Sequence, residues 1–293
     1  MSSLGKELVI GTANFGLPYG VGQTQVSDSD IQRIIFDAIG RDDVFLETGP
    51  SYFGVEEKIG EVLQGRDFNR IIIKVPPSAY GTVQSFMSSV DQSLSRLNRE
   101  VVFAILLHGT TDAFKKHCKV IEEATKEILV SQVAERVGIS CYEENEVLTA
   151  IETFPDMSIF QLPENLVDRR KINSLELQRM HEKGFMLQVR SVFLQGLLLG
   201  NQKRLPPELT EINRLRIEIE RNASLNELTS RELCIQYAAG ITWASQIILG
   251  AESYQQYLEN IETLNNARKD ISYQISQASD FVVDPRMWNL SNK

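Results

Sequence analysis

Four residues that can exchange protons follow apolar segments of the kind that form buried strands. Glu47 ends one short apolar run, and Tyr52 comes shortly after it, beyond a Gly-Pro turn. Lys74 follows Ile-Ile-Ile directly, and His108 follows Ile-Leu-Leu. A charged or imidazole side chain after such a run is costly to bury unless it is paired or used in chemistry. Each has an ordinary structural explanation when taken alone, but three successive strands that end in this way indicate one shared site.

The chemistry of this set follows from the residue types. A tyrosine hydroxyl is a weak acid, with an unperturbed pKa of roughly 10. An ammonium group beside it lowers that pKa by stabilising the phenolate, and a carboxylate keeps the ammonium charged and oriented. A histidine can polarise a carbonyl oxygen from the other side. The set therefore predicts a proton donor that faces a carbonyl, or a proton acceptor that faces an alcohol.

Short apolar strands alternate with helices along the chain, and the strands must position these side chains. Strands are expected at 7–13, 44–46, 70–75, 101–107, 137–140, 158–162, 185–189 and 245–249. Helices are expected at about 28–39 (with Ser27 as N-cap), 55–63, 83–97, 144–153, 172–183, 209–220, 230–239 and 254–267. A further helical stretch follows the fourth strand and is expected to reach about residue 136.

Eight strands with little polar alternation, each separated by a helix, indicate buried parallel strands. This number and the length of 293 residues predict an α/β fold, a (β/α)8 TIM barrel, as a single domain over residues 1–293. A doubly wound open sheet is the alternative, and it is expected to carry a Gly-rich phosphate-binding turn after its first strand. The segment GTANFG at 11–16 lacks the GxGxxG spacing, which favours the barrel.

Composition excludes several classes of partner. Net charge is −9 and the basic residues are scattered, which argues against nucleic acid or an anionic membrane as partner. No apolar window has the length of a membrane span, and the N-terminus carries no signal core. Cys118, Cys141 and Cys234 lie far apart without CxxC spacing, so we expect reduced thiols in a cytoplasmic protein and no metal site.

Several stretches are specific as a set because of their order and spacing. They are LVIGTANFG at 8–16, LETGPSYFGVEEKIG at 46–60, RIIIKV at 70–75, AILLHG at 104–109, VGISCY at 137–142, FQLPENLVDRR at 160–170, VRSVFLQGLLL at 189–199 and IILGAESYQQYLENI at 247–261. With these, essentially the whole chain resembles the aldo/keto reductase family. The resemblance implies a (β/α)8 barrel that transfers hydride between NADP(H) or NAD(H) and a carbonyl, alcohol or sugar-like small molecule.

The resemblance also implies roles for individual residues. Tyr52 takes the position of the general acid/base, Lys74 that of the group that tunes its pKa, and His108 that of the group that orients the substrate oxygen. Glu47 stands where the family places an aspartate, so the charge is kept on a longer side chain. The family's C-terminal segment often contributes to the substrate pocket, which predicts that the tail at 280–293 covers the barrel mouth. The loop at 14–22 is the other candidate lining of the pocket.

The same resemblance implies a binding surface for the cofactor. Its residues are Thr12, Ser140, Gln161, Arg190, Ser191, Gly196, Gly250, Ser253, Gln256 and Asn260. Arg190 stands where many relatives stack a tyrosine on the nicotinamide, and a guanidinium plane can stack similarly. A lysine and an arginine that often grip the 2′-phosphate of NADP(H) are here Gly250 and Gln256, so the choice between NADP(H) and NAD(H) stays open.

Two other functions stay open at this point. Glu47 and Cys141, which depart from the family pattern, are compatible with a module that binds a nicotinamide nucleotide with little or no turnover. Lys74 is compatible with a lyase that forms a Schiff base, since barrels also host lysine aldolases. The sequence leaves the substrate, the direction of the reaction and the oligomeric state open.

Overall fold

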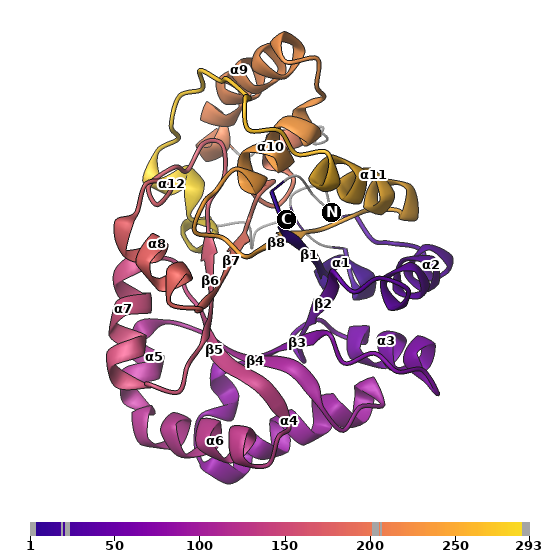
Figure 1. Ribbon diagram of the computed structural model, residues 1–293, viewed down its shortest axis with the longest axis vertical. Helices are drawn as coiled ribbons and strands as arrows, with labels where there is room; N and C mark the ends of the chain where they lie inside the picture. The colour runs from indigo at the N-terminus through magenta and orange to yellow at the C-terminus, as the bar shows by residue number, and fades with distance from the viewer. Residues whose placement is uncertain (1–3, 19, 21–23, 201–204, 206, 289–293) are drawn as a thin grey trace.

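Eight parallel strands close into a barrel, and the helices that connect them form a ring around it (Figure 1). The computed structural model describes residues 4–18, 20, 24–200, 205 and 207–288. The strands are β1 (Glu7–Gly11), β2 (Val44–Thr48), β3 (Ile71–Val75), β4 (Val102–His108), β5 (Ala134–Ser140), β6 (Ile159–Pro163), β7 (Met186–Arg190) and β8 (Gln246–Leu249). Each pairs with its neighbours in chain order, and β8 returns to β1, which confirms the predicted (β/α)8 barrel.

The longer helices are α2 (Asp28–Ile39), α3 (Val55–Leu63), α4 (Val83–Leu97), α6 (Cys118–Val130), α7 (Glu144–Thr153), α8 (Leu175–Glu182), α9 (Glu211–Leu225), α10 (Ser230–Ala239) and α11 (Tyr254–Asn265). Short ones are α1 (Ala13–Gly16), α5 (Thr111–Lys116), α12 (Asp280–Val283) and the 3₁₀ turns η1 (Pro77–Ala79), η2 (Leu197–Leu199), η3 (Pro207–Leu209) and η4 (Pro285–Met287). The predicted bounds of α2, α3, α4, α7 and α10 are confirmed. The Ser27 side chain caps α2 by accepting a hydrogen bond from the backbone N–H of Asp30, as expected.

The helical stretch predicted to run to residue 136 is wrong at its end. The helix α6 stops at Val130, and Gln132 adopts a left-handed conformation with φ of 58°. The strand β5 then begins at Ala134, which lies opposite Val102 of β4. Pairing with β4 therefore overrides the helical pattern of the sequence here. The first strand likewise ends at Gly11 rather than at residue 13, because Ala13 already begins α1.

Alternating residues of the strands face the inside of the barrel, and this alternation positions the site. A separate apolar cluster within the barrel contains Phe45, Ile72 and Leu106, among others. Glu47, Lys74 and His108 each follow one of these residues by two positions. Because side chains repeat with a period of two along a strand, the three polar residues face the same interior, nearer the carboxyl ends of the strands.

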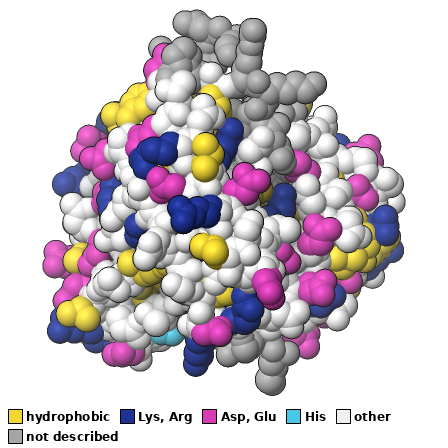
Figure 2. Space-filling model, turned by 90° about the horizontal axis from the view of Figure 1, so that it is seen from above, with side chains coloured by type: hydrophobic (Ala, Val, Ile, Leu, Met, Phe, Trp, Pro, Cys, Tyr) yellow, Lys and Arg dark blue, Asp and Glu magenta, His cyan; other side chains and the backbone are white. Residues whose placement is uncertain are grey.

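The outer surface carries charges of both signs. On the face shown in Figure 2, acidic and basic side chains are interspersed, with single apolar side chains between them. Among the described residues, no helix combines the length and apolar character needed to cross a membrane.

Candidate active site

The carboxyl ends of β2, β3 and β4 bring Glu47, Lys74 and His108 to one end of the barrel. Tyr52 lies on the turn that connects β2 to α3. Gly49 allows this turn to lie close to β3, because a Cβ atom at this position would approach the Lys74 carbonyl oxygen to 2.8 Å. The missing side chain at Gly49 thus lets the tyrosine reach the lysine.

Glu47 lies at the centre of this group. Its Oε1 is 2.7 Å from Lys74 Nζ and accepts a hydrogen bond of 3.2 Å from the Tyr52 hydroxyl. Lys74 Nζ also donates to the Tyr52 hydroxyl oxygen at 3.5 Å. The glutamate side chain therefore reaches both partners despite its extra methylene group.

The charges of this pair are set by burial and by their mutual contact. Burial opposes a charge on Glu47, but the Lys74 ammonium and hydrogen bonds from Lys74, Gln161 and Tyr52 together hold the pKa of Glu47 below its ordinary value. Burial lowers the pKa of Lys74, and contact with Glu47 only partly offsets this shift. The result is a buried ion pair whose positive end faces the tyrosine oxygen.

His108 ends β4, and its side chain lines a cavity at this end of the barrel. Its backbone N–H donates to the Tyr80 hydroxyl at 2.9 Å, and that hydroxyl donates to the Val75 carbonyl at 2.9 Å, which ties the ends of β3 and β4 together. Partial desolvation, followed by the charges of Lys74 and Arg190, lowers the pKa of His108 to about 4. The imidazole is therefore neutral near pH 7 and has a ring N–H to offer to an oxygen atom.

Gln161 connects this group to β5. Its Nε2 donates to Glu47 Oε2 at 2.7 Å and to Gln188 Oε1 at 3.2 Å, so both of its N–H groups are used. Its Oε1 accepts a hydrogen bond of 2.8 Å from the Ser140 hydroxyl. One lone pair of Gln161 Oε1 is thus left to accept a hydrogen bond, which suits a ligand that donates one.

The orientation of Gln161 is fixed by a chain of amides inside the barrel. Gln188 Nε2 donates to Gln246 Oε1 at 2.6 Å, and Gln246 Nε2 donates to Glu7 Oε2 at 2.8 Å. Because a carboxylate accepts only, Glu7 determines which way each amide points, up to Gln161 at the site. The strand sequences LQVR and SQIIL each place a glutamine in an apolar run, and this is the signal from which Gln188 and Gln246 can be recognised.

A cavity of about 340 Å³ extends from the group of Glu47, Tyr52 and Lys74 to the start of α11. Most of the predicted site residues line it: Glu47, Tyr52, Lys74, His108, Ser140, Arg190, Ser191, Gly196, Gly250 and Gln256. The others bond to residues of the lining: Gln161 and Thr12 donate to Glu47, Asn260 donates to the Gly250 carbonyl, and the Ser253 hydroxyl accepts from the Gln256 backbone N–H. Pro285 of the predicted tail and Asn14 and Gly20 of the predicted loop also line the cavity, whereas residues 19, 21 and 22 of that loop and 289–293 of the tail lie outside the described residues.

The segment after β7 has an unusual backbone where it passes the cavity. Ser191, Leu194 and Gln195 have positive φ values of 60°, 47° and 53°, and Gly196 follows with 83°. Left-handed conformations are unfavourable for residues with a side chain, and they concentrate at sites that bind ligands.

Arg190 has the features expected of a residue that contacts a cofactor. It donates to the Cys141 carbonyl at 2.9 Å and to the Ser191 hydroxyl at 3.1 Å, and its guanidinium lies 4.3 Å from the Tyr142 ring centroid. Its Nε is buried and has no hydrogen-bond partner among the described residues. The plane is thus held rigidly at the cavity wall, and the residues present fit a flat ring and its carboxamide.

Two charged residues at the far end of the cavity were missed by sequence reasoning. Arg231 of α10 and Glu252, just before α11, both line the cavity. Thr24 donates to the Glu252 carboxylate at 2.9 Å, and Arg231 donates to Asn260 Oδ1 at 3.5 Å. Neither residue follows an apolar strand directly, so only the tertiary structure brings them together.

The model of the aldo/keto reductase family matches residues 7–278 of this chain. The chain belongs to this family. Aldo/keto reductases are NAD(P)-dependent oxidoreductases, so the protein is an enzyme of this class that uses NADP(H) or NAD(H). A search of curated protein sequences found no match.

Solved structures share the barrel. An aldo-keto reductase from Bacillus halodurans in its holo form is 20% identical, with a TM-score of 0.68 over 94% of this chain and 89% of that chain. An aldo/keto reductase from Klebsiella pneumoniae in complex with NADP and acetate is 18% identical, with a TM-score of 0.68 over 90% and 87%. A thermostable aldo-keto reductase in complex with the inhibitor epalrestat is 18% identical, with a TM-score of 0.67 over 94% and 92%. At these identities the likeness describes the fold alone.

Proposed function

We propose that this aldo/keto reductase reduces an aldehyde or ketone, or oxidises the corresponding alcohol, with Tyr52 as general acid/base. The hydrogen-bonded group of Tyr52, Lys74 and Glu47 is the observation that carries this proposal. The nicotinamide cofactor, when bound, supplies the hydride that reaches the carbonyl carbon. Ser140, Arg190 and the free lone pair of Gln161 are the groups suited to hold its ring and carboxamide.

The side chains of the site supply the proton and the orientation. The neutral His108 imidazole donates to the carbonyl oxygen and holds it toward the tyrosine. Tyr52 gives its proton to that oxygen as negative charge develops there. The Lys74 ammonium, 3.5 Å away, stabilises the phenolate that remains, and Glu47 keeps the ammonium in position.

A binding module without turnover is less well supported. That alternative rested on the longer carboxylate of Glu47, yet Glu47 makes contacts of 2.7 and 3.2 Å with Lys74 and Tyr52. A Schiff base on Lys74 requires a free amine, whereas Nζ is engaged by Glu47. Failure to trap an adduct on Lys74 with borohydride across keto substrates would count against this second alternative.

We propose further that NAD(H) is preferred. With the nicotinamide at the catalytic group, the adenosine end of the cofactor extends toward Glu252 and Arg231. The negative charge of Glu252 offsets the positive charge of Arg231, so this pair offers no excess positive charge to the 2′-phosphate of NADP(H). A carboxylate at this end suits the ribose 2′-hydroxyl of NAD(H), as in other dinucleotide sites.

Fluorescence titration with NADH and with NADPH tests this preference. The wild type should bind NADH at least about tenfold more tightly, and Glu252→Gln should narrow the difference by improving NADPH binding. Glu262→Gln, on the exposed side of α11 and away from Arg231, is the matched control and should change neither affinity. Tighter binding of NADPH by the wild type would refute the preference, and binding of neither would refute the reductase proposal.

A further inference from the structure

The charges that line the cavity of about 340 Å³ do not cancel at its inner end, beside the proposed acid/base. Among the described residues, five charged side chains line this cavity, and two of them, Arg231 and Glu252, lie at its far end with opposite charges. At the inner end Glu47 and Lys74, 2.7 Å apart, neutralise each other. Arg190 is the fifth, so the inner end carries one excess positive charge.

The groups that hold the Arg190 side chain are neutral. Its guanidinium donates to the Cys141 carbonyl at 2.9 Å and to the Ser191 hydroxyl at 3.1 Å, and it lies over the Tyr142 ring. Within the described part of the chain it forms no ion pair with a carboxylate, and its Nε is buried without a partner there. Because a guanidinium is always charged in proteins, this positive charge is both fixed in place and without a counter-charge.

The positive charge of Arg190 acts on the groups that surround the reacting carbonyl. Burial, followed by the charges of Lys74 and Arg190, lowers the pKa of His108 to about 4. Burial and the Arg190 charge likewise lower the pKa of Lys74, and contact with Glu47 offsets only part of this shift. Apart from Glu47, no acid among the residues that the structure describes contributes to either shift. A molecule at the inner end of the cavity therefore meets the charge of Arg190 directly.

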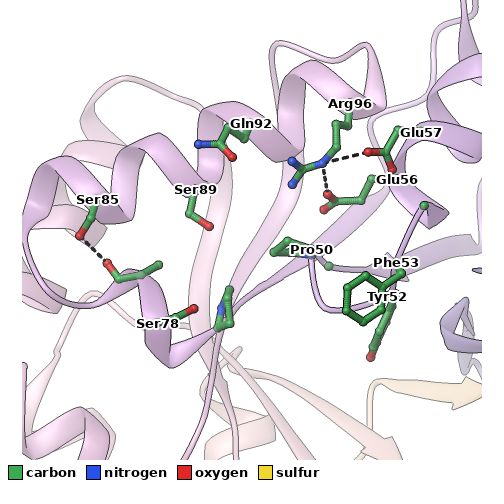
Figure 3. Close-up of a pocket in the computed structure, with 14 residues that line it drawn as sticks. Pro50, Tyr52, Phe53, Glu56, Glu57, Ser78, Ser85, Ser89, Gln92 and Arg96 are labelled. Atoms are coloured by element: carbon green, nitrogen blue, oxygen red, sulfur yellow. Dashed lines mark hydrogen bonds and ion pairs between the residues drawn. The ribbon is translucent and has the colours of Figure 1, made fainter.

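Charges on the outer side of the β2–α3 turn do not neutralise Arg190. There Arg96 Nε lies 2.7 Å from Glu56 Oε2 and 3.7 Å from Glu57 Oε1 (Figure 3). These side chains line a different cavity, of which Arg190 is not a part. The Tyr52 hydroxyl points away from them in Figure 3, so the turn separates the two sets of charges.

We propose that Arg190 raises the reduction potential of the bound nicotinamide cofactor by disfavouring its oxidised form. Reduction of a carbonyl takes a hydride from NAD(P)H and a proton from Tyr52 and yields the alcohol and NAD(P)⁺, and oxidation of the alcohol is the reverse. Because hydride passes only over a short distance, the ring must lie at the inner end of the cavity, beside Tyr52 and His108. The ring is neutral in NAD(P)H and positively charged in NAD(P)⁺, so Arg190 repels only the oxidised form. This inference rests on the proposed reductase function and assigns the control of its redox balance to one residue.

The ratio of two dissociation constants tests this proposal. The Kd of the reduced cofactor is measured from its fluorescence and that of the oxidised cofactor by competition, with the pair, NAD(H) or NADP(H), that the wild type binds more tightly. Arg190→Gln should lower the ratio of the oxidised Kd to the reduced Kd by about tenfold or more, because like charges a few ångströms apart repel strongly where water is largely excluded. A tenfold fall in this ratio lowers the reduction potential of the bound couple by about 30 mV. Arg190→Lys keeps the charge and should hold the ratio within about threefold of the wild-type value, whatever its effect on both affinities together.

Two further variants separate the charge of Arg190 from its shape. Arg190→Met is a second neutral variant and should give the same ratio as Arg190→Gln. Arg231→Gln removes the arginine at the far end of the same cavity and should change both Kd values by one factor, which leaves the ratio as in the wild type. An unchanged ratio in the neutral variants, even with both forms weakened equally, would overturn the proposal and leave the reductase function intact. Binding of neither form by the wild type would instead refute the reductase function, and this inference with it.

Discussion

Replacing Glu47 by glutamine should remove about 3–5 kcal/mol from the free energy of unfolding at pH 7. The Glu47 and Lys74 side chains are only 4% and 9% exposed and lie 2.7 Å apart, so the variant leaves a buried ammonium without a counter-charge. Loss of one partner of a buried pair costs about 3–5 kcal/mol, a large share of a typical total of about 5–15 kcal/mol.

The pH dependence gives this prediction a second signature. In the wild type the pKa of Glu47 lies below its ordinary value of 4.5, so its stabilisation is present above that pH and is lost as the pH falls through the folded-state value. In the variant the pKa of Lys74 falls further below its ordinary 10.5. Between the lowered pKa and 10.5, Lys74 is protonated in the unfolded chain but largely neutral in the folded one. The free energy of unfolding of the variant therefore rises with pH more steeply than that of the wild type.

Urea unfolding at pH 7 and at pH 9.5, followed by tryptophan fluorescence, measures both effects. The deficit of Glu47→Gln should be large at pH 7 and smaller at pH 9.5. The control is Glu122→Gln, which removes an exposed ion pair with Lys126 and should leave the free energy of unfolding unchanged within error. A variant as stable as the wild type at pH 7, or a deficit that does not change with pH, would show that the two groups do not form a buried ion pair.

Three further changes have distinct expected outcomes. His108→Gln should lower kcat/KM roughly 10²–10³-fold, the loss typical of one oxyanion donor, without changing the Kd for NADH. Because the pKa of His108 is lowered to about 4 in the folded protein, the free energy of unfolding of the wild type should fall as the pH drops from 6.5 toward 4. His108→Gln should reduce this fall. The same pH profile of unfolding in both proteins would contradict the lowered pKa. Gln188→Leu leaves the amides of Gln161 and Gln246 each without one partner, which should lower the free energy of unfolding in urea by about 1–3 kcal/mol per amide. Because Gln161 is then less firmly held, NADH binding should also weaken. An unchanged free energy of unfolding would argue against the amide chain. Gly60→Ala should lower Tm and cost about 1–3 kcal/mol, because its Cβ would overlap the α4 backbone; an unchanged Tm would mean that α3 and α4 lie further apart.

Local signals made most of the fold predictable. The Ser27 cap and the apolar periodicity of α2 lie in adjacent residues, and the apolar strands follow one another in chain order. The position of Glu47, Lys74 and His108 followed from one rule, since parallel strands end at the same edge of the barrel. The start of β5 at Ala134 could not be predicted in this way, because it is decided by pairing with Val102 of β4, which lies far away in the sequence.

The remainder of the site depends on contacts that no local pattern contains. Glu252 is held by Thr24, which is 228 positions away, and the amide chain joins four strands through single side chains. The reach of Glu47 to Tyr52 depends on Gly49, whose role is visible only where the turn meets Lys74. Residue types alone therefore predicted that Glu47, Tyr52, Lys74 and His108 share one site, but not the groups that orient them.

Turnover by Tyr52→Phe tests the central claim most directly. The phenylalanine keeps the aromatic ring and removes only the hydroxyl that bonds Glu47 and Lys74. With NADH and a carbonyl that the wild type reduces, kcat should fall by about 10²–10⁴-fold, the contribution typical of a general acid, while the Kd for NADH stays within about twofold. Turnover at the wild-type rate by a variant that binds NADH normally would contradict the role of Tyr52 and with it the proposed mechanism.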